Sequence, residues 1–577
     1  MGVNVKRSAM LSMATVLTLG TLLVACSDKK EDPKPTESAN TSTETNNTDT
    51  KVDEPAKIDP ITISVFIGAQ GPIPNEDNKI YKKIKEELGV TLKEEYLVGD
   101  IEQKLGVMIA GGDYPDLITA NPKLVSAGAM LPLEDLIEQN APRLKEHYAK
   151  VWEQMKDPGD GHIYWLPNYG VYQGDFVTTW YSGPAFWIQK AVLKEFGYPK
   201  LKTLDEYFDL LEQYKAKYPQ IDGQPTIGFT TLAYDWRKWP LLNAPEHLTG
   251  HPNDGNVVVD PATNVARAFF ATDIDKPYYK KLNDMNAKGM IDKEAFAQNY
   301  DQYQAKISSG RVLGMFDQHW NFNNAETALT DAGKIERTYL GIPLTYDGTV
   351  TDYYLDRPAL NLNNGFGITK GAKDPVAILK FLDTMLDEKW SKVLQWGIEG
   401  EDYIVNPDGK FARTQEMRDI QTNADWKASN RAQELLEYLP KIQGQYSDGN
   451  ATDAGSQPDE FFAGQTDFDK EVYAAYGAKL PSDLFSAPPE NRVSYPAWSI
   501  DLIEGSPAKI ASTKMEELAL KHLPKVIMSK PESFESAWDD YVKAMSKVDV
   551  KAYEDRINEQ LKWRADTWTS SNGSFEK

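Results

Sequence analysis

The sequence of 577 residues is poor in residues that bind metals or form cross-links. It contains one cysteine, Cys26, and six histidines. A single cysteine excludes an intrachain disulfide and a cysteine-based zinc site. Basic residues are also few relative to acidic ones: 63 Lys and Arg against 86 Asp and Glu give a net charge of −23. This balance argues against non-specific nucleic-acid binding, which requires a positive field around the phosphates.

The only long apolar run lies at the start of the sequence. Lys6 and Arg7 precede an uncharged stretch over residues 8–27, which is typical of an export signal. The end of the run, Leu23-Val24-Ala25-Cys26, resembles the bacterial lipobox, in which the cysteine is diacylated and becomes the first residue. We therefore expect a signal peptide over residues 1–25 and lipid attachment at Cys26, on the outer face of the bacterial cytoplasmic membrane. An uncleaved anchor helix is the alternative.

Residues 26–57 follow this run and contain no aromatic residue. The stretch is rich in Thr, Ser, Asn, Glu, Lys and Pro. It offers too little apolar surface to offset the entropy of ordering, so the sequence predicts a flexible linker.

The composition of the remaining chain supports a folded body. Apolar residues make up 41% and aromatic residues 11%, which is enough for packed cores, and the length suggests two to four domains. Apolar patterning predicts strands at residues 61–67, 90–98 and 117–120, with helices at residues 78–88 and 100–110 between them. This β-α-β-α-β order predicts a mainly parallel sheet, in which ligands bind beyond the carboxyl ends of the strands.

Helices are expected to dominate the later part of the chain. Thr203-Leu-Asp-Glu206 has the spacing of a capping box, and helices are predicted at residues 375–390 and 534–545. Residues 365–369 are predicted to form a strand. A helical C-terminal half after a βαβ start suggests two lobes, between which the chain crosses more than once.

Several segments resemble those of extracellular solute-binding proteins of carbohydrate ABC transporters, family 1, in the lipoprotein branch common in Gram-positive bacteria. They follow one another over nearly the whole chain after the lipobox: Gly111-Gly-Asp-Tyr-Pro-Asp-Leu-Ile118, Asp160-Gly-His-Ile-Tyr-Trp-Leu-Pro167, Phe186-Trp-Ile-Gln-Lys190, Thr203-Leu-Asp-Glu-Tyr207, Ile307-Ser-Ser-Gly-Arg311, Asp317-Gln-His-Trp320, Trp396-Gly-Ile-Glu-Gly400 and Ser536-Ala-Trp-Asp-Asp-Tyr541. One departure concerns calcium, which some relatives bind in an acidic loop after the Thr-Leu-Asp-Glu helix. The corresponding Gln220-Ile-Asp-Gly-Gln-Pro225 is too poor in oxygen ligands, so no metal is expected there.

The resemblance implies an α/β protein with the two-lobed, periplasmic-binding-protein-like fold of class II type and a ligand cleft between the lobes. The N-terminal lobe is expected to comprise residues 58–170 and 310–370, and the C-terminal lobe residues 171–309 and 371–577. The implied function is to bind an oligosaccharide and deliver it to the permease subunits of an ABC importer. No cofactor and no catalysis are implied, and a monomer is the default expectation.

Candidate ligand-binding residues follow from the chemistry of sugars, whose apolar faces stack on aromatic rings and whose hydroxyls bond to carboxylates and amides. Packing in a core is the alternative for each aromatic residue, and a cap or a solvated position is the alternative for each polar one. The candidates combine these residue types with loop-like sequence surroundings: Gln70, Trp180, Trp236, Asp317, Trp320, Trp396, Glu399, Tyr403 and Trp498.

Two other functions remain open from the sequence. The same fold could bind a peptide or another solute that is not a sugar. A secreted glycoside hydrolase or lyase is the second alternative, because the spacing of paired carboxylates exists only in three dimensions. His247 and His251 have the i, i+4 spacing of a zinc motif, but the neighbouring Pro and Gly predict a loop and no glutamate follows His247.

Overall fold

The computed structural model describes residues 59–71, 73–157, 159–174, 179–356, 360–362, 364–488 and 496–568. The predicted signal peptide, Cys26 and the predicted linker lie outside these ranges. All described residues belong to one compact unit, Pro55–Lys577. Within the described ranges, no helix combines the length and the apolar character that a membrane span needs.

The first sheet has the strand order β2-β1-β3-β14-β4. Strand β1 (Ile61–Ile67) is a β-branched run that pairs in parallel with β2 (Val90–Tyr96) and β3 (Leu117–Thr119) on either side of it. β14 (Gly365–Ile368) is antiparallel to β3 and to β4 (Leu166–Pro167). The predicted β-α-β-α-β start and the mainly parallel arrangement of its strands are confirmed.

The helices between these strands begin and end at the residues that the sequence suggests. α1 (Lys79–Leu88) begins at Asn78, whose side chain accepts hydrogen bonds from the first turn, and α2 (Ile101–Gly111) begins in the same way at Asp100. Both end at a glycine with positive φ, Gly89 and Gly112, where a side chain would strain the backbone.

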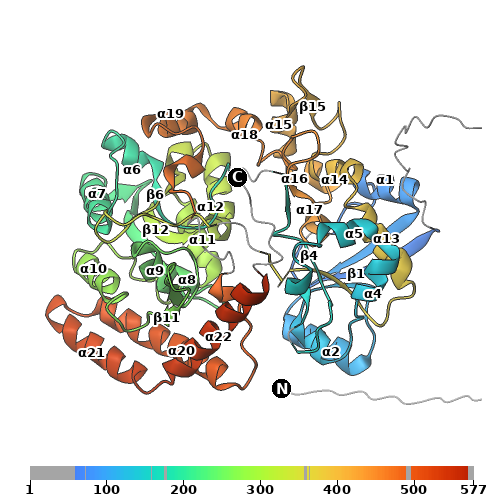
Figure 1. Ribbon diagram of the computed structural model, residues 1–577. Helices are drawn as coiled ribbons and strands as arrows, with labels where there is room; N and C mark the ends of the chain where they lie inside the picture. The colour runs from blue at the N-terminus through green and yellow to red at the C-terminus, as the bar shows by residue number, and fades with distance from the viewer. Residues whose placement is uncertain are drawn as a thin grey trace, which may run out of the picture. The chain divides into compact units, whose positions relative to one another are not determined.

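The second sheet has the order β13-β6-β12-β9. β6 (Pro184–Gln189) pairs antiparallel with both β13 (Tyr339–Ile342) and β12 (Val312–Gln318), whereas β12 and β9 (Ile227–Thr230) are parallel. α7 (Leu204–Lys217) carries the predicted capping box at Thr203. α10 (Lys276–Ala287) shares a core with α20 (Pro507–Met528), α21 (Phe534–Met545) and α22 (Val550–Trp568), which appear in red beside it in Figure 1.

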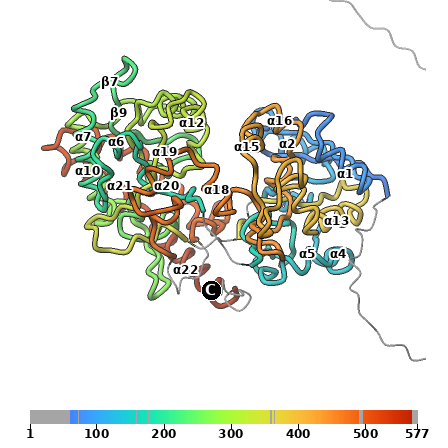
Figure 2. The backbone as a smooth tube through the Cα atoms, turned by 90° about the horizontal axis from the view of Figure 1, so that it is seen from above, coloured from blue at the N-terminus to red at the C-terminus, as the bar shows by residue number. Residues whose placement is uncertain are grey.

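The sheets place the lobe crossovers at positions other than those expected. Residues 310–370 were assigned to the N-terminal lobe, but β12 and β13 within that range pair with β6 in the second sheet. α13 (Pro375–Thr384) and α14 (Glu388–Gln395) were assigned to the C-terminal lobe, but their apolar faces share a core with β1. Figure 2 shows the yellow α13 beside the blue α1. The single helix predicted over residues 375–390 is divided because Asp387 has an extended backbone and caps α14.

The remaining elements are mostly short. They are α3 (Pro122–Ser126), α4 (Glu134–Asn140), α5 (Pro142–His147), β5 (Tyr172–Gln173), α6 (Lys190–Glu195), β7 (Gln220–Ile221), β8 (Gln224–Pro225), α8 (Trp239–Leu242), α9 (Ala244–Leu248), β10 (Val257–Val259), β11 (Ala266–Ala268), α11 (Tyr300–Ser308), α12 (His319–Asp331), β15 (Ile404–Val405), β16 (Phe411–Ala412), α15 (Gln415–Gln421), α16 (Ala424–Asn430), α17 (Gln433–Leu436), β17 (Gln443–Gly444), α18 (Pro458–Gly464) and α19 (Asp467–Ala475), with short 3₁₀ turns at Trp152–Met155, Ile335–Arg337, Pro481–Leu484, Ala497–Ser499 and Pro531–Ser533.

Candidate functional site

Three tryptophans meet at the carboxyl ends of β9 and β12. Trp236 and Trp239 follow β9, and Trp320 lies in the first turn of α12, directly after β12. Their ring centroids are 5.1 to 6.1 Å apart, and the rings of Trp236 and Trp320 are nearly parallel, with an interplanar angle of 10°. Since the two strands are parallel, their carboxyl ends lie at one edge of the sheet, where α/β proteins bind ligands. We call Trp236, Trp239 and Trp320 the tryptophan cluster.

The cluster offers aromatic surface to solvent. Trp236 is 61% exposed and Trp320 is 42% exposed, well above the usual exposure of tryptophan. The Arg237 guanidinium lies 4.6 Å from the ring centroid of Trp236 and 4.1 Å from that of Tyr300, and it forms an ion pair with Asp235. The indole N–H of Trp320 donates to Gln318 at 2.7 Å. Aromatic rings that are fixed by these contacts can stack on the apolar face of a sugar.

Asp317 lies beneath the cluster and is fully buried. Its carboxylate accepts hydrogen bonds from the Trp239 indole at 3.0 Å, the Tyr303 hydroxyl at 2.6 Å and the Asn321 amide at 3.0 Å. Burial raises the pKa of Asp317 to about 6, although these bonds favour the charged form. Asp317 was expected to contact the ligand, but in this structure it supports the surface that a ligand would contact.

A pocket of about 810 Å³ adjoins the first turn of α12 through Trp180. The Trp180 ring lies 4.7 Å from the ring of His319, which precedes Trp320, and 5.9 Å from that of Phe461. We call this space the aromatic pocket. Its wall combines aromatic rings with side-chain amides: Tyr169, Tyr172, Trp180, Phe461, Gln395, Gln433, Gln443, Gln445 and Gln457. Charged residues of both signs also line it: Lys410, Glu437, Lys441, Asp453 and Asp459. A pocket with apolar faces and many neutral hydrogen-bonding groups suits a polyhydroxylated ligand.

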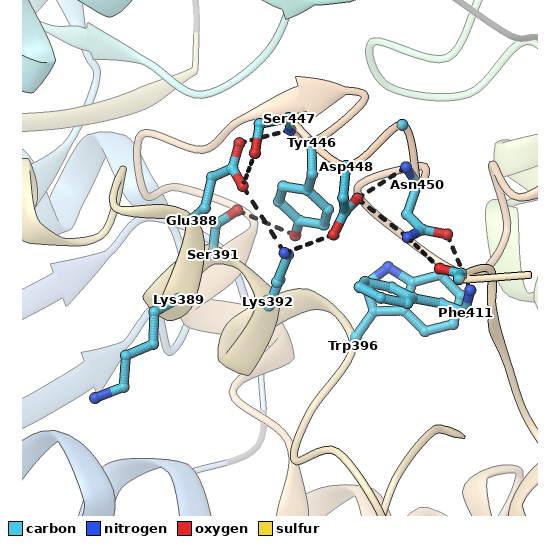
Figure 3. Close-up of polar contacts among 12 residues, drawn as sticks. Glu388, Lys389, Ser391, Lys392, Trp396, Phe411, Tyr446, Ser447, Asp448 and Asn450 are labelled. Atoms are coloured by element: carbon cyan, nitrogen blue, oxygen red, sulfur yellow. Dashed lines mark hydrogen bonds and ion pairs between the residues drawn. The ribbon is translucent and has the colours of Figure 1, made fainter. Parts of the chain in front are cut away.

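One wall of the aromatic pocket, which includes Gly449 and Ala451, is held by α14, as Figure 3 shows. Glu388 accepts hydrogen bonds from the backbone and side chain of Ser447, and Lys392 forms an ion pair with Asp448 at 2.8 Å. Asn450 accepts from the backbone N–H of Phe411 at 2.9 Å. These contacts fix the loop over residues 446–451, so this wall is formed without a ligand.

Trp396 and Tyr403 lie in a separate small core with Phe411 and Tyr446. Trp396 is fully buried, and its indole donates to the carbonyl of Ala451 at 2.9 Å, so it supports the pocket wall from behind. Tyr403 is only 4% exposed, whereas Glu399 is exposed. The structure therefore joins Trp396 and Tyr403 to each other but gives neither ring a free face for a sugar.

The other two candidates make no ring contact with the tryptophan cluster among the described residues. Gln70 is exposed in the loop after β1, beyond the carboxyl edge of the first sheet. Trp498 is 48% exposed and packs against Gly255, whose carbonyl accepts from Asn243 directly after α8. The structure thus brings together Trp236, Asp317 and Trp320, and it joins Trp180 to them through His319. Ligand contact by any of these residues remains a prediction.

Several residues of the aromatic pocket were not among the candidates predicted from the sequence. Tyr169 lies in the loop after β4, Tyr172 lies in β5, and the glutamines at 443, 445 and 457 lie in a segment rich in small and polar residues. Glutamine is common on surfaces, so these residues carry no distinctive signal. Their gathering is a consequence of tertiary structure, and no local signal in the sequence indicated it.

No group of three or more His, Cys, Asp or Glu side chains among the described residues is arranged to hold a metal ion. The segment that corresponds to the calcium loop of some relatives forms the hairpin of β7 and β8, with Asp222 and Gly223 at positive φ in its turn. Asp222 forms an ion pair with Lys334 at 2.7 Å. A two-residue Asp-Gly turn uses this carboxylate at the surface and builds no oxygen cage.

Comparison with known proteins gives matches in sequence and in structure. Residues 79–393 match the family described as bacterial extracellular solute-binding protein. The fructooligosaccharide ABC transporter substrate-binding protein FusA of Streptococcus pneumoniae is 28% identical over 278 residues, which are 45% of this chain and 50% of FusA. Lipoprotein LipO of Bacillus subtilis is 20% identical over 360 residues, 59% of this chain and 66% of LipO. The matches thus span about half to two thirds of these relatives.

The fold agrees with that of a solved family member. The structure of FusA from S. pneumoniae in complex with kestose superposes with a TM-score of 0.64 at 20% identity, covering 88% of this chain and all of the FusA chain. At this identity, the likeness establishes the two-lobed α/β fold. Because the family match also extends over more than half of the 577 residues, the protein belongs to the bacterial extracellular solute-binding proteins.

Proposed function

We propose that the protein is the substrate-binding component of an ABC importer and binds an oligosaccharide reversibly. The observation that carries the proposal is the tryptophan cluster: Trp236 and Trp320 expose 61% and 42% of their surfaces at the ligand-binding edge of a sheet. Stable proteins seldom leave large indole rings exposed without a partner. FusA, which is named for fructooligosaccharides, provides independent support.

The chemistry of the two regions is complementary. The tryptophan cluster supplies ring faces, and the aromatic pocket supplies rings together with amide donors and acceptors. A sugar hydroxyl both donates and accepts, so side-chain amides can satisfy both of its roles. A ligand with several sugar rings could occupy both regions, because Trp180 and His319 join them.

Binding of this kind requires no bond to be broken. A ligand that prefers the closed arrangement of two lobes shifts the population toward it by its difference in affinity, and a permease can then recognise that arrangement. We further propose that Cys26 carries two acyl chains, which hold the protein at the outer face of the bacterial cytoplasmic membrane near the permease. Replacement of Cys26 by Ser should release the protein into the culture medium.

A binding screen with product analysis tests the proposal. The purified protein is titrated calorimetrically with kestose, maltotriose and cellotriose, and each sugar is then recovered and its chain length determined. We expect at least one sugar to bind and to be recovered intact. New reducing ends would instead support a glycosidase or lyase. Binding of peptides and of no sugar would support another solute.

A further inference from the structure

Asp317 combines complete burial with the absence of a neutralising cation. Among the described residues, no lysine or arginine forms an ion pair with it. Arg237 pairs with Asp235, and His319 pairs with Glu326. A buried carboxylate without a cation is costly to the folded state, and such groups persist where their hydrogen bonds define a local geometry.

The hydrogen bonds of Asp317 tie four elements together. Within β12 and α12, the carboxylate accepts from the backbone N–H of Gln318 at 2.7 Å and from the Asn321 amide at 3.0 and 3.1 Å. From α11 it accepts the Tyr303 hydroxyl at 2.6 Å, and from α8 it accepts the Trp239 indole at 3.0 Å. The backbone N–H of Gln318 and the indole of Trp239 can only donate, whereas the Tyr303 hydroxyl can also accept. The ionised carboxylate is the form that accepts from all four groups at once, and its charge strengthens each bond.

Trp239 connects Asp317 to the two exposed rings. Its ring centroid lies 5.2 Å from that of Trp236 and 5.1 Å from that of Trp320, so it is in contact with both. The first turn of α12, which carries Trp320, is tied to the same carboxylate through Asn321. The orientation of both exposed rings therefore depends on Asp317.

We propose that Asp317 is a positioning residue, which fixes the tryptophan cluster through its bond to Trp239 and thereby sets ligand affinity without contact to the ligand. The inference rests on the proposed function for its effect on affinity. Its structural part, the control of ring geometry, holds for the protein without ligand.

The raised pKa of about 6 gives the proposal a pH signature. Protonation removes the negative charge of the carboxylate and so weakens the charge-assisted bond that the Trp239 indole donates to it. The titratable groups that interact with Asp317 from adjoining elements are Tyr303 and Tyr300 of α11. Arg237 lies against the Tyr300 ring, and His319 is two residues after Asp317 at the start of α12, so variants must separate their charges from that of Asp317.

The variants are chosen to isolate one hydrogen bond. Asp317→Asn keeps the size of the side chain but replaces one acceptor oxygen by a donor. Trp239→Phe removes the indole N–H and keeps an aromatic ring. Asp275→Asn is the matched control, because Asp275 is also fully buried and lies at α10, outside the tryptophan cluster. His319→Gln removes the neighbouring imidazole.

The first measurement is fluorine NMR of the ligand-free protein labelled with 5-fluorotryptophan. Resonances of Trp236, Trp239 and Trp320 are assigned by single replacement with Phe. We expect the Trp239 resonance to shift with a midpoint near pH 6 in the wild type and in His319→Gln, and to lose this midpoint in Asp317→Asn. In Asp275→Asn the three resonances should stay at their wild-type positions. Unchanged resonances of Trp236 and Trp320 in folded Asp317→Asn would overturn the proposal.

The second measurement is kestose affinity by titration calorimetry at pH 7.5. We expect roughly tenfold weaker binding in Asp317→Asn and in Trp239→Phe, no further loss in the double variant, and wild-type affinity in Asp275→Asn. Affinities equal to that of the wild type in both single variants would overturn the link to affinity. If wild-type protein binds none of the sugars, the proposed function fails, and the NMR titration still decides whether Asp317 positions the rings.

Discussion

Replacement of Trp236 by alanine should weaken ligand binding while the protein remains folded. Trp236 is 61% exposed, which for a tryptophan side chain of about 250 Å² leaves roughly 150 Å² accessible. A sugar that covers one ring face would bury about half of this area, roughly 75 Å². At about 25 cal/mol per Å², this contact contributes about 2 kcal/mol, or roughly a 30-fold change in Kd.

The buried part of Trp236 sets the expected loss of folding stability. About 100 Å² of Trp236 is buried, so truncation should lower the free energy of unfolding by at most about 2.5 kcal/mol. The measurements are calorimetric titration with the best-binding sugar and urea unfolding followed by circular dichroism. Trp563→Ala is the control: Trp563 is 38% exposed on α22, packs on Trp568 and lies outside the proposed site. A Kd within twofold of wild type in folded Trp236→Ala would refute the role of the cluster.

Other predictions concern the fold that carries the site. Lys190→Met should lower the free energy of unfolding by about 3 kcal/mol in urea titrations, because it removes the ion-pair partner of buried Asp469, which lies 2.6 Å away. The double variant with Asp469→Asn should recover part of this loss. Gly314→Ala should destabilise β12 by about 2 kcal/mol or more, because its Cβ would lie 2.0 Å from the Tyr207 hydroxyl; native yield and thermal unfolding test this. Burial raises the pKa of Asp275 to about 8, so the folded state binds this proton more tightly than the unfolded state. Stability should therefore rise as pH falls from about 8 toward 4 through this group, and Asp275→Asn should flatten the pH dependence of the free energy of unfolding in that range.

Local signals in the sequence were sufficient for the three parallel strands of the first sheet and the helices between them. Asn78 and Asp100 cap the helices that the apolar pattern predicts, and β1 begins and ends where its β-branched run does. The boundaries between lobes were wrong for a physical reason. β12 is buried on both faces and reads simply as an apolar strand, and nothing in such a run specifies which sheet it joins.

The candidate site was also predicted only in part from the sequence. The sequence identified Trp236 and Trp320 because large aromatic residues beside polar loop residues are distinctive. It could not separate them from Trp396, whose surroundings in the sequence look alike but which is fully buried. Nor could it place Asp317 beneath Trp239, because the 3.0 Å bond between them joins residues 78 positions apart.

Equilibrium binding of an oligosaccharide, with recovery of the sugar, shows whether the protein binds its ligand reversibly and leaves it intact. A fluorescently labelled kestose is dialysed against the purified protein, and the bound fraction is released by denaturation and its mass determined. We expect reversible, saturable retention of sugar with unchanged mass. Cleaved sugar in the released fraction, or no retention of any oligosaccharide in the panel, would contradict it.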